Sequence, residues 1–440
     1  MARPVIAIVG RPNVGKSTLF NKLVGERISI VDDTPGVTRD RIYGKVEWLD
    51  KTADIIDTGG IEPYSDDIIL KQMRRQAELA IDAADVIILV TDLKSGLVTT
   101  DIEVATMLQK SGRPVVLCVN KCDRIGEPPA EFYEFYNLGL GDPIAVSSVH
   151  GHGTGDLLDE CFKFIDFDKE DEYDEDTVKV AIIGKPNVGK SSLVNSIAGE
   201  ERVIVSNVAG TTRDATDTEV ENKYGKFVLI DTAGIRRKSR VDDNVEKYSV
   251  LRSYMAVDRS DVCVIMIDAT EGFTEQDSKV AGYAHEQGKA CVIAVNKWDA
   301  VEKDNNSVKK YTNDIRKVLS FLPYAEIVFV SAKTGQRLPK LFDTLEVVIQ
   351  NHSLRIATGV LNDILAEAVA MQQPPSDKGR RLKIYYMTQV SVKPPTFVIF
   401  VNSKKLMHFS YTRYLENKIR EAFGFSGTPL KFFVRERKEN

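Results

Sequence analysis

The sequence predicts an α/β protein that contains two copies of one domain, followed by a small α+β domain. Three observations lead to this prediction. Residues 10–27 recur 174 positions later, short β-branched runs alternate with helical patterns inside each copy, and this alternation changes after residue 352. A repeat of this length is a whole domain present twice, not a solenoid unit.

Composition and length exclude several classes of protein. The chain has 440 residues, of which 43% are hydrophobic and 28% charged, so it is long and apolar enough to bury a sizeable core and is neither disordered nor a coiled coil. Its five cysteines form no CxxC pair, which favours a reducing compartment. No apolar run reaches the ~18 residues of a membrane span, and no signal peptide precedes the first strand. We therefore expect a cytoplasmic protein.

Four short motifs occur in both copies in the same order. The offset is 174 for the first three and 176 for the fourth. They are GRPNVGKS (10–17) and GKPNVGKS (184–191), GVTRD (36–40) and GTTRD (210–214), DTGGI (57–61) and DTAGI (231–235), and NKCD (120–123) and NKWD (296–299).

Strands and helices alternate along the first copy. Helical patterns begin at Lys16 and near Ile68, Asp101, Glu131 and Thr154. The predicted strands are residues 5–9, 45–50, 53–57, 86–90, 115–119 and 144–147. Strands separated by helices indicate a mostly parallel sheet with helices on both faces.

The repeat and the composition divide the chain into four parts. The first copy covers residues 1–165 and the second covers 178–352. Between them, residues 166–177 contain eight acidic residues and one lysine, which is typical of an extended linker. The C-terminal domain covers residues 353–440. Residues 354–440 carry a net charge of +8, whereas the rest of the chain carries −13. This basic end is a weak indication that the protein binds nucleic acid.

The C-terminal domain has an αββαβ pattern of elements. Leu361, Leu365 and Ala368 belong to a helical stripe that ends before Pro374 and Pro375. Two strands follow, at 383–392 and 397–401, then a second helical stripe that reaches Phe423 and a last strand at 430–435.

The first motif is a P-loop, G-x4-G-K-[ST], and in both copies it lies between an apolar strand and a helix start. Gly15 and Gly189 let backbone amides close around a phosphate, and the helix N-terminus attracts negative charge. Lys16 and Lys190 are expected to reach the β- and γ-phosphates, with Ser17 and Ser191 on Mg²⁺. The structural alternative is a simple glycine turn before a helix. It is disfavoured because the whole motif occurs twice, each time between a strand and a helix.

The next two motifs complete a nucleotide site. Asp57 and Asp231 follow strands and fit a role on Mg²⁺ through a bound water, and Gly60 and Gly234 can approach the γ-phosphate. In the N-K-x-D motifs, a carboxylate at Asp123 or Asp299 accepts hydrogen bonds from guanine N1–H and its 2-amino group. Adenine would leave this acceptor unpaired, so the motif selects guanine.

With these motifs the chain resembles the Era-like, TRAFAC-class GTPases. The tandem arrangement with a small third domain is similar to the bacterial Der (EngA) family, and this similarity covers essentially the whole chain. It implies two tandem P-loop GTPase domains with a C-terminal KH-like domain. It also implies that Thr38 and Thr212 bind Mg²⁺ from switch I, and that Ser331, Ala332 and Lys333 contact the base. The corresponding residues in the first copy are Ser147, Ser148 and Val149, which depart from the S-A-K pattern.

The candidate site residues fall into three groups. Those expected to act in hydrolysis are Lys16, Thr38, Gly60, Lys190, Thr212 and Gly234. Those expected to hold Mg²⁺ are Ser17, Thr38, Asp57, Ser191, Thr212 and Asp231. Those expected to bind GTP or GDP are Gly10, Asn13, Gly15, Lys16, Ser17, Thr18, Asp57, Gly60, Asn120, Lys121, Asp123 and Ser147, and in the second copy Gly184, Asn187, Gly189, Lys190, Ser191, Ser192, Asp231, Gly234, Asn296, Lys297, Asp299, Ser331, Ala332 and Lys333.

Both copies lack a common catalytic residue. Ras-like enzymes orient the attacking water with a glutamine, whereas Ile61 and Ile235 stand at that position. We therefore expect slow intrinsic turnover that needs assistance. Asn13 and Asn187 resemble the asparagine that holds K⁺ in related GTPases, although an asparagine can also simply support the loop turn. Arg39 and Arg213 are either cis arginine fingers or solvated switch residues.

Three other features carry weaker hypotheses. His150 and His152 flank a glycine but lack further ligands at metal spacing, so we expect loop residues. GFSG (424–427) matches the KH clamp G-x-x-G, but it joins a helix to a strand, which favours a turn. KGRRLK (378–383) and RERK (435–438) are either phosphate contacts or solvated faces.

We therefore expect a GTP-hydrolysing switch protein that acts in assembly of the large (50S) ribosomal subunit. The ribosomal role follows from the resemblance, which also implies GTP or GDP, Mg²⁺ and K⁺ as ligands and ribosomal RNA as a partner. We expect a monomer with no membrane or DNA partner. Two alternatives are a nucleotide-sensing RNA-binding scaffold and a GTPase accessory to RNA modification.

Overall fold

The structure is a computed structural model in which two compact units can be distinguished. It describes residues 3–25, 43–60, 77–78, 80–81, 83–124, 126–167, 173–174, 176–199, 204–206, 217–230, 245–302, 306–377 and 380–437. Among these residues, the first unit ends at Phe167 and the second begins at Tyr173. No helix in these ranges is both long enough and apolar enough to cross a membrane. The helix predicted near Ile68 lies outside the described residues.

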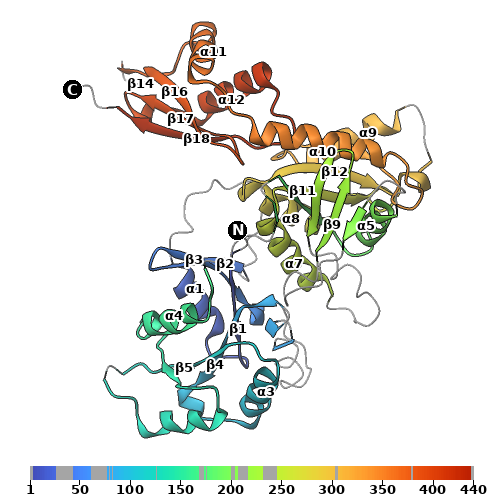
Figure 1. Ribbon diagram of the computed structural model, residues 1–440. Coiled ribbons are helices and arrows are strands. Elements are labelled where there is room, and N and C mark those ends of the chain that lie inside the picture. Colours follow the sequence, from blue (N-terminus) through green and yellow to red (C-terminus); the bar gives the residue numbers. More distant parts are fainter. Residues whose placement is uncertain are drawn as a thin grey trace. The chain divides into compact units, whose positions relative to one another are not determined.

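The first unit is built on a mostly parallel sheet, as predicted (Figure 1). Its strands are β1 (Val5–Val9), β2 (Tyr43–Trp48), β3 (Lys51–Asp57), β4 (Val86–Asp92), β5 (Val115–Asn120) and β6 (Ile144–Ala145). The strand order is β2-β3-β1-β4-β5-β6, and β2 is antiparallel to β3 while the other pairs are parallel. Every residue of β1 and β4 is buried, because both faces of the sheet are covered.

The helices of the first unit begin close to the predicted positions, with one difference in type. They are α1 (Lys16–Val24), α3 (Thr99–Lys110) and α4 (Thr154–Lys163), together with the short 3₁₀ helices η1 (Thr58–Gly60) and η2 (Leu93–Ser95). The helix predicted near Glu131 is a 3₁₀ helix, η3 (Ala130–Leu138). Its buried residues Phe132, Phe135 and Leu138 are spaced by three, which is the period of a 3₁₀ helix.

The second unit contains a sheet of the same strand arrangement with one more edge strand. Its strands are β7 (Val178–Ile183), β8 (Ile204–Ser206), β9 (Thr218–Asn222), β10 (Gly225–Ile230), β11 (Val262–Asp268), β12 (Ala290–Asn296) and β13 (Glu326–Phe329), in the order β13-β12-β11-β7-β10-β9-β8. The additional edge strand is β8, which pairs antiparallel with β9. Its helices are α5 (Lys190–Ala198), α7 (Val245–Arg259), α8 (Glu275–Glu286), η5 (Trp298–Ala300), α9 (Ser307–Val318) and α10 (Leu338–Ser353).

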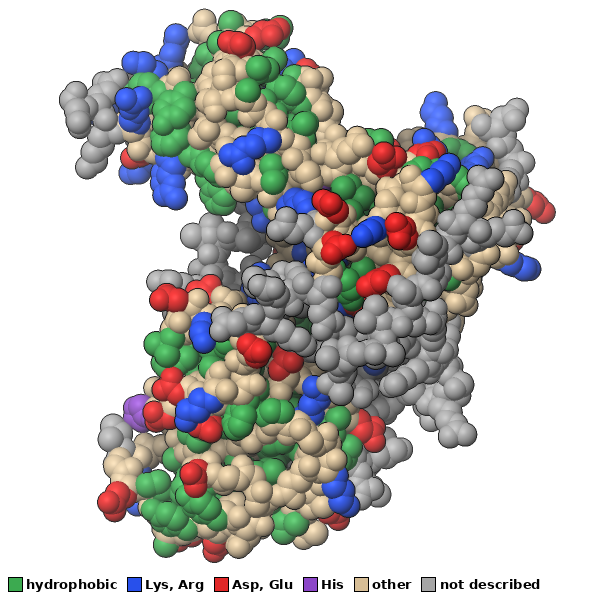
Figure 2. Space-filling view, viewed as in Figure 1, with side chains coloured by type: hydrophobic (Ala, Val, Ile, Leu, Met, Phe, Trp, Pro, Cys, Tyr) green, Lys and Arg blue, Asp and Glu red, His purple; other side chains and the backbone are tan. Residues whose placement is uncertain are grey.

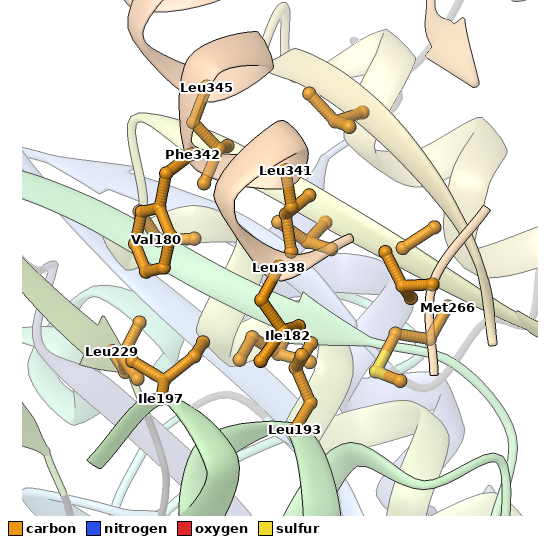
Figure 3. Packing of buried hydrophobic residues seen from close by; sticks show 14 of the residues in the cluster. Val180, Ile182, Leu193, Ile197, Leu229, Met266, Leu338, Leu341, Phe342 and Leu345 are labelled. Carbon is orange, nitrogen blue, oxygen red and sulfur yellow. The ribbon is translucent and has the colours of Figure 1, made fainter. Parts of the chain in front are cut away.

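The core of this second sheet lies between the strands and helices α5 and α10 (Figure 3). Leu338, Leu341, Phe342 and Leu345 of α10 are all buried there. Figure 3 shows them in one cluster with Val180, Ile182, Leu193, Ile197, Leu229 and Met266. Burial of each such aliphatic side chain contributes about 1.5–3 kcal/mol. This packing fixes α10, and the loop that precedes it, against the carboxyl end of the sheet.

The C-terminal part of the second unit has the predicted αββαβ order, with one additional short hairpin. Its elements are α11 (Thr358–Met371), β14 (Ser376–Asp377), β15 (Arg380–Arg381), β16 (Ile384–Ser391), β17 (Thr396–Val401), η6 (Lys404–Leu406), α12 (Phe409–Phe423) and β18 (Lys431–Glu436). β17 lies between β16 and β18 in a three-stranded sheet. Its residues Phe397, Ile399 and Val401 are fully buried in one cluster with Leu361 of α11 and Leu415 of α12.

The GFSG segment is a turn between α12 and β18, and it packs against the second P-loop domain. The Gly427 N–H donates to the Tyr324 carbonyl at 2.8 Å, and the Cys291 N–H donates to the Gly427 carbonyl at 2.8 Å. Gly427 has φ +76°, and any Cβ there would collide with Val348. Phe425 is fully buried. The turn predicted for this segment is therefore confirmed, and its backbone is occupied by protein contacts.

Candidate functional site

The two P-loops have the same local conformation. Gly15 and Gly189 precede α1 and α5 with φ of 96° and 101°, a region that favours glycine. Asn13 and Asn187 both have φ of 65°, and both side chains are exposed. A Cβ on Gly15 would collide with the side chain of Asn120, and one on Gly189 with that of Asn296. These close approaches explain why glycine stands at this point of both motifs.

The P-loop lysines extend across the inside of their loops. Lys16 Nζ donates to the carbonyls of Gly10 and Arg11 at 2.7 and 2.8 Å. Lys190 Nζ donates to those of Gly184 and Lys185 at 2.5 and 2.8 Å. Burial lowers the pKa of Lys16 to about 8, although the charge of Asp57 partly opposes this shift. An ammonium group beside a helix N-terminus makes each loop a cradle for a phosphate.

Two oxygen ligands converge at the mouth of the first P-loop. Ser17 Oγ donates to Asp57 Oδ2 at 2.6 Å, and Gly59 N–H donates to Asp57 Oδ1 at 2.9 Å. Asp57 is 1% exposed, at the carboxyl end of β3. A serine hydroxyl next to a carboxylate is the kind of donor set that Mg²⁺ accepts. Thr18 and Ser192 are the exposed third residues of α1 and α5.

The asparagine of each N-K-x-D motif joins the P-loop to the loop that follows the next strand. Asn120 Nδ2 donates to the Val14 carbonyl at 2.7 Å, and Asn120 Oδ1 accepts from the Ser148 N–H at 3.0 Å. In the second copy, Asn296 makes the corresponding bonds to the Val188 carbonyl and the Ala332 N–H, at 2.8 and 2.9 Å. The S-S-V and S-A-K loops therefore take equivalent positions despite their different sequences.

The motif lysines and aspartates also have matching partners. Lys121 Nζ lies 2.6 Å from Asp92 Oδ2, and Lys297 Nζ lies 2.5 Å from Asp268 Oδ2. Lys121 Nζ also donates to the Asn13 carbonyl at 2.8 Å.

The carboxylate of each N-K-x-D motif accepts a hydrogen bond from a hydroxyl in the following loop. Ser147 Oγ donates to Asp123 Oδ1 at 2.8 Å, and Ser331 Oγ donates to Asp299 Oδ1 at 2.6 Å. Lys333 and Val149 occupy corresponding exposed positions in the two loops.

The structure adds one residue that the motifs did not reveal. Lys94 of η2 donates through Nζ to Asp123 Oδ2 at 2.7 Å. The hydrogen bonds from Lys94 and Ser147 hold the pKa of Asp123 below its usual value. At the corresponding position the second copy has Thr270, whose hydroxyl donates to Asp268 instead, at 2.7 Å. The only sequence signal was this difference between D-L-K-S-G (92–96) and D-A-T-E-G (268–272).

The two histidines are loop residues, as expected, and several predicted site residues lie outside the described part of the chain. His150 and His152 stack on each other in the loop after Ser148, with ring centroids 5.8 Å apart. Among the described residues, no group of three His, Cys, Asp or Glu side chains is arranged to hold a metal ion. Thr38, Arg39, Ile61, Thr212, Arg213, Asp231, Gly234 and Ile235 lie outside the described residues, and Gly60 is described only as the last residue of η1.

Two family models match the chain. Residues 5–121 and 179–297 match a model described as a 50S ribosome-binding GTPase. Residues 355–435 match the KH-domain-like C-terminal domain of EngA bacterial GTPase enzymes.

Curated relatives match the chain along its whole length. GTPase Der of Acetivibrio thermocellus is 62% identical over 439 residues and GTPase Der of Agathobacter rectalis is 65% identical over 441, with 100% of both chains covered in each case. Among solved structures, Aquifex aeolicus Era bound to GDP·AlF4⁻ is 21% identical, covering 60% of this chain and 95% of its own, and its TM-score of 0.30 is too low to bear on the fold. On the family models and the full-length relatives, the chain belongs to the Der (EngA) family of GTPases.

Proposed function

We propose that this GTPase uses two guanine-nucleotide sites to control its binding to the large ribosomal subunit during assembly. The observation that carries the proposal is the repetition of one hydrogen-bond pattern around both P-loops, from Lys16 and Asn120 in the first copy to Lys190 and Asn296 in the second. We further propose that it acts as a monomer in the bacterial cytoplasm.

Phosphate binding would change the partners of the P-loop lysines. In the described geometry Lys16 and Lys190 are bonded to loop carbonyls, and they would turn to the β- and γ-phosphates while the amides at the starts of α1 and α5 face the same group. Mg²⁺, when bound, would neutralise part of the phosphate charge. Ser17, Asp57 and Thr38 would hold it in the first copy, and Ser191, Asp231 and Thr212 in the second. Gly60 and Gly234 would approach the γ-phosphate.

Guanine selection rests on Asp123 and Asp299. Ser147 and Ser331 hold one oxygen of each carboxylate, and this orients the carboxylate to accept from guanine N1–H and the 2-amino group. The two sites differ at Lys94, which occupies the second oxygen of Asp123 and competes with the base. We therefore propose that Lys94 makes guanine-nucleotide binding weaker at the first site than at the second, which has Thr270 in its place.

Replacement of Lys94 by threonine, the residue of the second copy, should tighten GDP binding at the first site. The competing ion pair is exposed, and such pairs contribute roughly 0.2–1 kcal/mol, so the expected gain is about 1.5- to 5-fold. The affinity should be measured by titration calorimetry on a chain that also carries Asp299→Asn. This change leaves the polar groups of guanine unpaired in the second site, so only binding at the first site is measured.

Lys163→Thr is the matched control, because Lys163 forms an exposed ion pair with Glu160 elsewhere in the same unit. Its GDP affinity should equal that of the parent chain. If Lys94→Thr weakens GDP binding, Lys94 supports the nucleotide instead of competing with it. Two remaining GDP sites in the Asp299→Asn chain would refute the assignment of Asp299.

We propose that K⁺ assists hydrolysis, with Asn13 and Asn187 supplying side-chain oxygens. The support is that both asparagines are exposed on loops of identical conformation, next to where the β–γ bridge would lie. A monovalent cation there compensates charge that develops in the transition state. An asparagine that only supports the loop turn would give no cation dependence.

Hydrolysis in KCl should be on the order of tenfold faster than in NaCl at equal ionic strength. The difference should shrink in Asn13→Ala and Asn187→Ala chains and vanish when both are replaced. Phosphate release at saturating GTP is the measurement. Equal rates in the two salts would transfer the catalytic assistance to Arg39, Arg213 or a protein partner.

The ribosomal part of the proposal predicts nucleotide-dependent binding. Its support is the family description as a 50S ribosome-binding GTPase and the basic C-terminal domain. Large subunits should co-sediment with the chain in a GTP analogue and much less in GDP, because ligands shift conformations only through differential affinity. Binding should fall with salt, and it should fall on neutralising Arg380 and Arg381 but not Lys317 of α9.

Sedimentation that is independent of nucleotide would refute the switch and leave an RNA-binding protein that also hydrolyses GTP. Failure to turn over GTP at all would favour the nucleotide-sensing scaffold.

A further inference from the structure

Within the described part of the C-terminal domain, α11 and α12 cover one face of the three-stranded sheet and leave the other without a helix. Helices α11 and α12 pack against the face that contains Met387, Phe397 and Ile399, all of which are buried. Side chains alternate between the two faces of a strand, so the neighbours of these residues point to the opposite side. The strand register sets Tyr386 beside Phe400 and Phe400 beside Arg435, and it sets Thr388 beside Val398 and Val398 beside Phe433. These six residues form the open face.

The open face is aromatic and partly exposed. Phe433 is 52% exposed, in the middle of β18. Tyr386 and Phe400 are half-buried and stack across the strands, with ring centroids 4.4 Å apart and an interplanar angle of 13°. Exposed phenylalanine at the centre of a strand adds nothing to the core of this domain. Aromatic side chains on a sheet surface are, however, what unpaired bases stack on.

One end of the open face is strongly basic. Arg435 lies on the face itself and is exposed. Lys383 Nζ and the Arg437 guanidinium lie 5.1 and 6.0 Å from the ring centroid of Tyr385, next to Tyr386. Lys404 and Lys405 of η6 are also exposed, and the Lys404 N–H is bonded to Glu436 of β18. Figure 2 shows Lys and Arg side chains around hydrophobic ones at this end of the domain.

The other candidate RNA-binding segment of this domain, GFSG (424–427), is already bonded to protein. A G-x-x-G clamp needs its backbone free to approach phosphates, whereas Gly427 is bonded to Tyr324 and Cys291. The open face combines aromatic rings with positive charge, and none of its six residues takes part in the hydrogen bonds of Gly427. A protein segment would match the apolar part of the face but would have to supply several carboxylates for its basic end.

We propose that the open face binds single-stranded RNA, with unpaired bases on the aromatic side chains and phosphates on Arg435 and its neighbours. This deepens the proposed ribosomal function by naming the surface and the form of RNA. Binding of free RNA tests it separately from binding of the ribosome.

The first experiment measures the affinity of the full chain for a fluorescein-labelled 12-nucleotide single-stranded RNA, by anisotropy at fixed salt. Phe433→Ala should weaken binding about 5- to 100-fold, since one base loses its stacking partner. Phe433→Trp should restore it. The matched control is Phe409→Ala, which removes a 66% exposed phenylalanine from the start of α12 and should leave the affinity unchanged.

The second experiment tests charge and strandedness. Arg435→Gln with Arg437→Gln should lower the slope of log affinity against log salt by about 1.4, at about 0.7 for each single-strand phosphate contact. An RNA duplex of the same length should bind more weakly, because its bases are already stacked. The unfolding midpoint and GTP hydrolysis of every variant should match those of the parent, which excludes misfolding as the cause.

The proposal is overturned if Phe433→Ala and Phe409→Ala bind RNA equally well, if duplex and single strand bind equally, or if the parent chain binds no RNA oligonucleotide. The last result would assign the face to a protein. If Phe433→Ala loses free RNA but still sediments with large subunits, the RNA face stands and its use on the ribosome does not. If the parent chain binds RNA as predicted but does not bind large subunits, the proposed ribosomal function is refuted and the RNA-binding face is not.

Discussion

A buried asparagine amide holds each nucleotide site together. Asn120 is 2% exposed and bridges the P-loop at Val14 to the loop at Ser148, and Asn296 does the same between Val188 and Ala332. An amide has one donor group and one acceptor, and here each satisfies a backbone partner from a different loop. Because these loops carry the P-loop lysine and the serine that bonds Asp123 or Asp299, their spacing depends on this one side chain. Its loss would leave buried backbone groups unpaired, which costs about 1–3 kcal/mol for each group.

The two copies keep this framework and differ around it. The exchange of Lys94 for Thr270 changes the surroundings of the N-K-x-D carboxylate without altering any backbone bond described above. In the second copy, two elements that flank the candidate site also contact the C-terminal domain. β12 begins beside Gly427 and ends at Asn296. α10 follows the Ser331 loop, and His352 in its last turn lies with Nδ1 2.6 Å from Thr428 Oγ1. The site and the C-terminal domain therefore share two buried elements.

The sequence was most informative where motifs and periodic patterns coincide. The repeat predicted both P-loops. The β-branched runs predicted the mostly parallel sheets, because the central strands β1, β4, β11 and β12 are buried on both faces. The 3₁₀ helix at 130–138 was predicted only as helical, since the spacing of Phe132, Phe135 and Leu138 is too short a signal to separate the two helix types. The hairpin of Ser376–Asp377 and Arg380–Arg381 has two-residue strands that carry no period. Lys94 and Gly427 act through partners 29 residues or more away in the chain, and no local pattern encodes such pairs.

The most direct test of the shared framework is the number of GDP molecules that the chain binds when each asparagine is replaced by alanine. Calorimetry on the parent should give two sites. Asn120→Ala should remove the first and leave the second, and Asn296→Ala should do the reverse, because each amide organises only its own loops. Retention of both sites at parental affinity in either variant would contradict the central role of the asparagine bridge.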